Sequence, residues 1–312
     1  MHIKSLLKNN PLIVITGPTA SGKTRVSIEL SKYLDIEIIS ADSRQIYKYL
    51  DIGTAKPTKE ELALVKHYFI DLINPDEYFS AGLFGLQAKK IALEILKRNK
   101  IPIVVGGSGL YIKALCEGLF KEEKNISYIN QKEIFKKIYI NKSKEELYYQ
   151  LLQVDPDSAK KYQDKNPRRL MRALEFYHVY GYPISIAQKN NLEPAIFNTM
   201  YFGINIERNI LYEKINKRCE KMWEDGLINE TEKILKMGYS PYLNSLNTVG
   251  YKEAIAYLDG KLKQSEALSL MKQNTRHYAK RQLTWFKKNE NIVWLEGSYQ
   301  EIATKIARTK LI

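Results

Sequence analysis

The stretch "VITGPTASGKT", residues 14–24, decides the fold of this chain. An apolar run leads into a turn of small residues, and Lys23 and Thr24 then open a helical pattern. The turn matches the P-loop pattern G-x-x-x-x-G-K-[ST], in which backbone N–H groups surround phosphate oxygens and a helix N-terminus adds positive potential. We therefore predict a phosphate site made of Gly17, Pro18, Thr19, Ala20, Ser21, Gly22, Lys23 and Thr24, with the Thr24 hydroxyl as a ligand for Mg²⁺.

The residues around this loop predict an α/β fold with a parallel sheet flanked by helices. Short apolar runs indicate strands at 12–16, 36–40 and 101–105, and helical spacing is found at 23–34 and 80–99. Strands that alternate with helices in this way are typical of a parallel sheet with helices on both faces.

The pattern changes between residues 121 and 196, where charged amphipathic segments replace the short strands. We expect a helical insertion domain there, within a P-loop core formed by residues 1–120 and 197–312. The second part of the core begins with a strand over 199–206, continues through mostly helical segments, and closes with a strand over 291–297.

Composition narrows the function without fixing it. The chain has 312 residues and a formal charge of +14, and such a basic balance favours polyanionic partners such as nucleic acid. Abundant surface lysine would give the same charge without any such partner. Two cysteines outside a C-x-x-C pair predict a cytoplasmic protein without structural disulfides or zinc. We expect no membrane span, because no apolar run approaches the ~20 residues that one requires.

The second motif, "ISADSRQIYKYLDIGTAKP" over 39–57, places Asp42 just after a predicted strand. Side chains at the carboxyl ends of parallel strands face the ligand crevice, so this carboxylate could act as a general base or bind Mg²⁺. It could equally cap a helix. Arg44 and Gln45 carry hydrogen-bonding groups that suit a nucleobase or a phosphate.

Three further features have two interpretations each. The glycines of "VVGGSGLYIKAL", residues 104–115, permit close approach of either a ligand or a helix. Arg168, Arg169 and Arg172 share one helix face, which suits RNA phosphates or a solvated surface. "TRHYAKRQLTWFKK", residues 275–288, interleaves basic and aromatic residues, as in a nucleic-acid surface or at the rim of a core.

Taken together, these stretches resemble the bacterial tRNA dimethylallyltransferases, also called tRNA isopentenyltransferases. Besides the motifs above, the resemblance rests on "HYFIDLINPDEYFSAGLF", "VDPDSAKKYQDKNPRRLMRALEFYHVYGYPIS", "LYEKINKRCEKMWEDGL" and "VGYKEAI", in family order from residue 12 to 288. The combination of "DSRQIY…DIGTAKP" with "AKRQLTWF" is highly specific, whereas the P-loop alone is not.

The resemblance implies transfer of a dimethylallyl group from dimethylallyl diphosphate to N6 of the adenosine 3′ of the anticodon, with Mg²⁺ as cofactor. It implies Asp42 as general base, Thr24 and Arg218 as further catalytic residues, and the insertion domain as the part that binds the anticodon stem-loop. The implied tRNA contacts are Asp42, Ser43, Arg44, Gln45, Ser108, Arg168, Arg169, Leu170, Met171 and Arg172, to which we add Arg276, Lys280 and Arg281.

The chain departs from the family pattern at Ser108, where threonine is common, at Lys214, where arginine is frequent, and at Tyr68, where a histidine is usual. The lysine lacks a bidentate fork, which leaves a role for it open. We expect a monomer. Two other functions remain open from the residues: a P-loop nucleotide or small-molecule kinase, and a non-catalytic RNA-binding protein.

Overall fold

The computed structural model describes residues 10–119, 139, 141–190 and 195–309. Contacts divide the chain into two units. Unit 1 comprises Met1–Cys116 and Ile196–Ile312, and unit 2 comprises Glu117–Ala195. Each unit has its own apolar core, so each is considered separately below.

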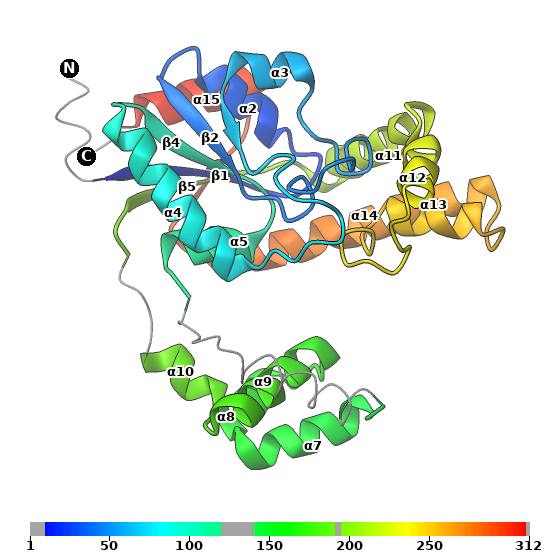
Figure 1. The fold of residues 1–312 in the computed structure, drawn as a ribbon. Helices are drawn as coiled ribbons and strands as arrows, with labels where there is room; N and C mark the ends of the chain where they lie inside the picture. Colours follow the sequence, from blue (N-terminus) through cyan, green and yellow to red (C-terminus); the bar gives the residue numbers. More distant parts are fainter. Residues whose placement is uncertain (1–9, 120–138, 140, 191–194, 310–312) are drawn as a thin grey trace. The chain divides into compact units, whose positions relative to one another are not determined.

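A six-stranded sheet forms the centre of unit 1 (Figure 1). Its strands are β1 (Pro11–Thr16), β2 (Ile36–Ser40), β3 (His67–Tyr68), β4 (Ile101–Val105), β5 (Asn198–Ile204) and β6 (Ile292–Leu295). They lie in the order β3-β2-β4-β1-β5-β6, and every pairing is parallel. β1, β2 and β4 are buried along their whole length, as expected of strands covered on both faces. The predicted α/β fold with a parallel sheet is confirmed.

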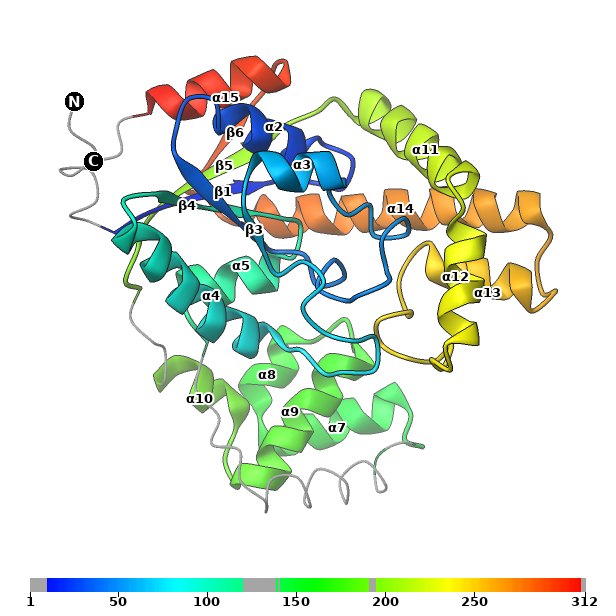
Figure 2. The ribbon, with the colours of Figure 1, turned by 45° about the horizontal axis from the view of Figure 1, so that its top comes forward.

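Two helical layers cover the sheet, because alternate side chains of a strand point to opposite faces. Val14 belongs to the apolar cluster beneath one pair of helices, whereas its neighbours Ile13 and Ile15 belong to the cluster beneath the other pair. The first pair is α4 (Ala81–Lys97) with α5 (Gly109–Cys116), and the second is α2 (Lys23–Leu30) with α15 (Tyr299–Arg308). Figure 2 shows the two pairs on opposite sides of the sheet.

Several elements of unit 1 differ from the sequence-based expectations. The helix predicted over 23–34 ends at Leu30. The short helix α3 (Lys59–Leu64) and strand β3 were not predicted, and the chain does not close on β6 but continues into α15. Helix α15 is amphipathic, and its apolar residues complete the second face of the sheet.

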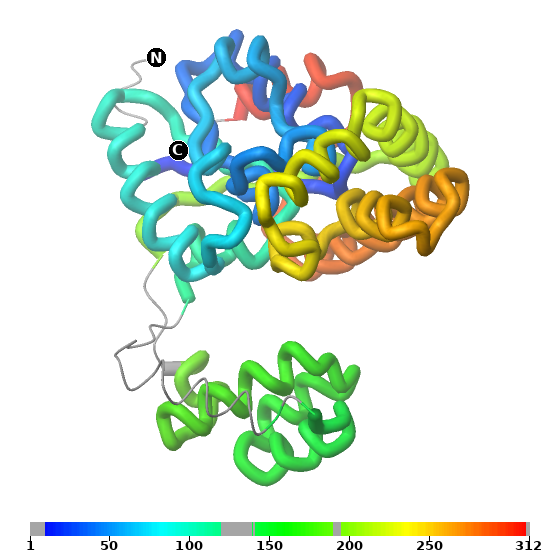
Figure 3. Tube along the Cα trace, turned by 45° about the vertical axis from the view of Figure 1, so that its right-hand side comes forward, coloured from blue at the N-terminus to red at the C-terminus, as the bar shows by residue number. Residues whose placement is uncertain are grey.

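Four further helices of unit 1 lie between β5 and β6 in the chain and pack on one another. They are α11 (Arg208–Glu224), α12 (Leu227–Lys236), α13 (Tyr251–Leu258) and α14 (Gln264–Phe286). Helix α11 packs along α14, and α13 packs against both α12 and α14, as Figures 1 and 3 agree in showing. The long α14 reaches from this layer back to α5, so it brings residues of the C-terminal third next to the P-loop.

Unit 2 is helical in its described residues. It contains α7 (Lys144–Val154), α8 (Pro156–Lys161), α9 (Pro167–Tyr180) and α10 (Ile184–Asn190). Buried Asp155 ties these helices together, since its Oδ1 accepts the Ser158 amide at 3.0 Å and its Oδ2 accepts the Ser185 amide at 3.1 Å. The segment predicted as helical over 121–140 lies outside the described residues apart from 139. None of the described helices of either unit is long and apolar enough to cross a membrane.

Candidate active site

The P-loop joins β1 to α2 in a conformation that depends on glycine. Gly17 and Gly22 have φ angles of +143° and +87°, in the region that side chains disfavour. A Cβ on Gly22 would lie 2.3 Å from Cε1 of Tyr299, so this α15 tyrosine lies directly on the loop. The N-cap of α2 is Gly22, which provides no side-chain hydrogen bond to the first-turn amides. These amides are therefore suited to binding an anion.

Lys23 lies at the centre of this loop. Its Nζ donates to the Gly17 carbonyl at 3.0 Å and to the Pro18 carbonyl at 2.7 Å. Desolvation by burial, helped by the nearby Arg218 charge and opposed by Asp42, lowers the pKa of Lys23 to about 7. Burial likewise lowers the pKa of Arg218, and Asp42 again opposes the shift. The two cations and the carboxylate therefore lie close enough to influence one another.

Asp42 follows β2 and holds a turn, not an α-helix. Its Oδ1 accepts the Arg44 amide at 2.8 Å and the Gln45 amide at 3.4 Å, and both hydrogen bonds end on this one oxygen. The helix-cap alternative is thus only partly right, because the carboxylate caps a local turn through Oδ1. Within the described part of the chain Oδ2 accepts no hydrogen bond, which leaves an oxygen that could accept a substrate proton.

Residues beside Asp42 make contacts within the protein. The Ser43 amide donates to the Ser108 hydroxyl at 3.2 Å, which joins the second motif to the glycine-rich turn after β4. Arg44 Nη1 donates to the Asn244 carbonyl at 2.7 Å. Gln45 Nε2 donates to the carbonyls of residues 54 and 55, so both ends of this side chain already have partners. Direct tRNA contacts by these residues stay predictions.

The glycines after β4 are explained by packing against protein groups. A Cβ on Gly107 would lie 2.1 Å from Nε2 of Gln282, and one on Gly109 would lie 2.0 Å from Nε1 of Trp285. Both side chains come from α14, so here the helix-packing interpretation holds. Trp285 can pack its indole against Gly109 because this residue has no side chain.

Gln282 is a site residue that sequence reasoning missed. Its Oε1 accepts the Thr19 amide at 2.7 Å, and its Nε2 donates to the Gly107 carbonyl at 3.0 Å. The predicted use of the Thr19 amide for phosphate is therefore corrected, because that N–H is bound by Gln282. One turn earlier, Tyr278 lies near the same centre, and burial followed by the Asp42 charge raises its pKa. The signal in the sequence was "AKRQLTWF", in which Gln282 is polar on the inner face of a helix.

The remaining predicted residues fall in different places. Arg276 donates to Asn216 Oδ1 at 2.7 Å, while Lys280 and Arg281 are exposed on α14. Lys214 lies 5.7 Å from the centroid of the Tyr299 ring that covers Gly22, so it is near the P-loop.

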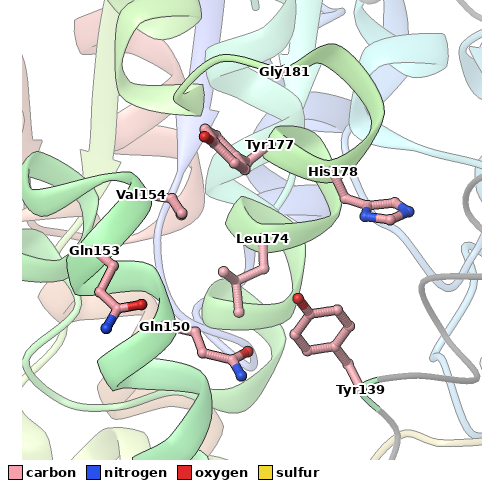
Figure 4. Close-up of a pocket in the computed structure, with 8 residues that line it drawn as sticks. All are labelled: Tyr139, Gln150, Gln153, Val154, Leu174, Tyr177, His178 and Gly181. Atoms are coloured by element: carbon pink, nitrogen blue, oxygen red, sulfur yellow. The ribbon is translucent and has the colours of Figure 1, made fainter.

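In unit 2, Arg168 and Arg169 are exposed on α9, and Arg172 pairs with Glu175 at 2.8 Å. Met171 packs at the edge of the unit 2 core. A tRNA contact by the side chain of Leu170 is wrong, since this side chain is fully buried in that core. A cavity of about 510 Å³ in this unit is lined by Tyr139, Gln150, Gln153, Val154, Leu174, Tyr177, His178 and Gly181 (Figure 4), and no predicted site residue lines it.

The fold and site define a P-loop α/β protein whose phosphate loop adjoins a carboxylate and two desolvated cations. The profile of the IPP transferase family matches residues 45–289, so this chain belongs to that family. It is 44% identical to the tRNA dimethylallyltransferase of Acetivibrio thermocellus, over 95% of both chains.

Solved structures agree with this assignment. The tRNA isopentenylpyrophosphate transferase of Staphylococcus epidermidis is 39% identical, with a TM-score of 0.67 over 95% of this chain and 97% of that one. A eukaryotic dimethylallyltransferase acting on tRNA is 26% identical, with a TM-score of 0.76 over 96% of this chain and 75% of that one.

Proposed function

We propose that this protein transfers a dimethylallyl group from dimethylallyl diphosphate to N6 of the adenosine 3′ of the anticodon in tRNA. The observation that carries the proposal is the meeting of Lys23, Arg218 and Asp42 beside a P-loop, in a chain of the IPP transferase family. Two cations suit a diphosphate leaving group, and a carboxylate suits a general base. The family members compared above carry names of enzymes that prenylate tRNA.

The diphosphate would be bound by the amides of residues 20 and 22–24 together with Lys23 and Arg218, since the Ser21 amide donates to the Pro18 carbonyl at 3.3 Å. Loop amides and a helix N-terminus stabilise the negative charge that grows on diphosphate as the carbon–oxygen bond breaks. The cationic side chains are partly removed from water, which strengthens their attraction for that charge. Gln282 keeps the loop in place from α14 by holding the Thr19 amide.

The loop residues fit a magnesium ion bound together with diphosphate. Within the described ranges, no three or more His, Cys, Asp or Glu side chains are placed together to bind a metal. Mg²⁺ commonly takes most of its ligands from substrate phosphates and water, with only one or two from protein. The Thr24 hydroxyl would be such a ligand. The buried Ser21 Oγ has no hydrogen-bond partner among the described residues, so the loop holds a further polar atom that could bind a ligand. When bound, the ion would neutralise charge on the leaving diphosphate.

The acceptor nitrogen requires help from a base. The lone pair of an adenine amine is delocalised into the ring, so the amine is a weak nucleophile that becomes acidic as its bond to carbon forms. In the proposed reaction N6 attacks C1 of the dimethylallyl group, the C1–O bond breaks, and diphosphate leaves with the bonding electrons. Asp42 Oδ2 would accept the amine proton, because Oδ1 already holds the turn.

Unmodified tRNA and labelled dimethylallyl diphosphate, with and without ATP, provide the direct test. We expect label in tRNA at a rate that does not depend on ATP, since the substrate lacks a base and a ribose. Sustained ATP hydrolysis in the absence of tRNA, without prenyl transfer, would instead support the kinase interpretation.

We further propose that unit 2 supplies affinity for the anticodon stem-loop and that the protein acts as a cytoplasmic monomer. The support for the first part is the basic face of α9, formed by Arg168, Arg169 and Arg172. Arginine forks suit RNA phosphates better than lysine does.

A further inference from the structure

Glu230 on α12 holds three consecutive backbone amides of the loop that follows Asp42. Its Oε2 accepts the amides of Asp51 at 3.1 Å and Ile52 at 2.8 Å, and its Oε1 accepts the Gly53 amide at 3.1 Å. The Tyr251 hydroxyl donates to the same Oε1. Successive amides that converge in this way form an anion-binding nest, and here a carboxylate of the protein fills it.

The surroundings make this attachment rigid. The Tyr251 ring is fully buried and lies against the backbone of Gly53, where a Cβ would be 2.5 Å from the ring. Burial, followed by the Glu230 charge, raises the pKa of Tyr251, so its hydroxyl keeps its proton and remains a donor. The nest is thus held from one side by packing and from the other by charge-assisted hydrogen bonds.

A short path of hydrogen bonds leads from the nest to Asp42. The carbonyls of residues 54 and 55, which directly follow the nest, accept Gln45 Nε2 at 3.2 and 3.1 Å. The backbone amide of Gln45 in turn donates to Asp42 Oδ1 at 3.4 Å. The side-chain Oε1 of Gln45 accepts a hydrogen bond from the Ser40 hydroxyl at 3.2 Å. Lys56 closes the loop by donating to the Tyr47 carbonyl at 2.7 Å.

We propose that Glu230 is a positioning residue for prenyl transfer, which fixes the Asp42 carboxylate through residues 51–55 and Gln45. The inference rests on the proposed function, because it assigns Glu230 an effect on the proposed base. A general base must lie within hydrogen-bond reach of the proton it takes, and a displacement of about 1 Å can cost roughly 10²-fold in rate. Glu230 itself belongs to α12, outside the motifs that carry the phosphate loop and the base.

The test replaces Glu230 by glutamine, whose NH₂ group would face amide donors in place of an accepting oxygen. Single-turnover prenyl transfer at saturating tRNA should fall by roughly 10- to 100-fold. Affinity for dimethylallyl diphosphate should stay within about twofold, since the P-loop is untouched. Glu232→Gln is the matched control, because it lies on the same helix and pairs with Lys236 in solvent. Its rate should equal that of the wild type.

A double-mutant cycle distinguishes positioning from a general structural role. In an Asp42→Asn background, Glu230→Gln should cause little further loss, because the group that it positions is gone. Additive losses, an unchanged rate, or a parallel loss of diphosphate affinity would each overturn the proposal. If Glu230→Gln does not fold, Tyr251→Phe removes one of the four donors and should slow transfer about 2- to 10-fold with the same non-additivity. A wild-type protein that transfers no prenyl group would instead refute the proposed function.

Discussion

The phosphate site of unit 1 and the arginine helix of unit 2 use positive charge in opposite ways. Lys23 and Arg218 are desolvated, and the Asp42 charge opposes the resulting fall in the pKa of each. Arg168 and Arg169 on α9 are exposed, and Arg169 forms a surface ion pair with Asp164 at 3.5 Å. Charges removed from water interact strongly with a few atoms, whereas exposed charges act through the ion atmosphere of a polyanion. We infer that the first region serves chemistry and the second serves affinity.

Asp42→Asn should have the largest effect and should separate the two regions most clearly. Asparagine can still cap the turn through its carbonyl oxygen. Its NH₂ group replaces the second carboxylate oxygen and cannot accept the amine proton. Single-turnover prenyl transfer should fall by about 10²- to 10⁴-fold. Binding of tRNA and of dimethylallyl diphosphate, measured separately, should change little. Turnover near that of the wild type would reduce Asp42 to a turn-capping residue.

Replacing Arg168, Arg169 and Arg172 together with alanine probes the other region. The apparent KM for tRNA should rise by roughly 10- to 100-fold, and the salt dependence of log K should flatten by roughly 2 to 3, because up to three fewer counterions are released. The rate at saturating tRNA should not change. Since Arg172 pairs with Glu175, Glu175→Gln is a useful companion variant that alters α9 without removing a cation. An unchanged KM at physiological salt would remove the affinity role.

The pH dependence of diphosphate binding tests whether Lys23 is desolvated. Its pKa of about 7 means that the free protein loses the ammonium proton as pH rises through 7, while bound diphosphate raises the pKa and holds the proton. Affinity should therefore be highest below pH 7 and fall by up to about tenfold per pH unit above it. Calorimetry in buffers of different ionisation enthalpy should show uptake of about half a proton at pH 7.

The control for this experiment is Lys23→Arg, which stays charged over the same range. The difference in proton uptake between the two proteins removes the titration of the ligand itself. If both proteins take up protons equally, Lys23 is an ordinary solvated lysine.

Local patterns were sufficient to predict the phosphate loop and the strands of the sheet other than β3, because each depends on neighbours in the sequence. The strands read as continuous apolar runs, and the loop reads as a fixed spacing of glycine, lysine and threonine. Helices α3 and α15 were missed although each begins with a capping box, Thr58 with Glu61 and Ser298 with Glu301. Those signatures of four residues were present in the sequence and could have been used.

The partners of the site could not be predicted, because they come from distant parts of the chain. Gln282 meets the Thr19 amide across 263 positions, and Glu230 meets residues 51–53 across about 180. A single sequence gives no sign that the glycines at 107 and 109 face α14 and not a ligand. The carboxylate of Asp42 could be placed at the sheet edge by topology, whereas the oxygen that remains open depends on the turn geometry.

The smallest expected effect concerns Ser108. It tests how closely the rate of prenyl transfer depends on the position of Asp42 in unit 1, and so sharpens the comparison with the arginine helix of unit 2. The Ser108 hydroxyl accepts the Ser43 amide, one residue beyond Asp42, while its own amide donates to the Ala41 carbonyl at 3.1 Å. Ser108→Ala keeps the hydrogen bond from the Ser108 amide to the Ala41 carbonyl and removes the one from the Ser43 amide to the Ser108 hydroxyl. Loss of this neutral hydrogen bond should slow prenyl transfer by a factor of about 2 to 10 if the turn loosens. Ser108→Thr keeps the hydroxyl and should restore the rate. Alanine lacks the hydroxyl and threonine adds only a methyl group to serine, so a loss with alanine alone would assign the effect to the hydroxyl. A loss with both would mean that the added methyl group of threonine also disturbs the turn, and a loss with neither would remove Ser108 from the positioning of Asp42.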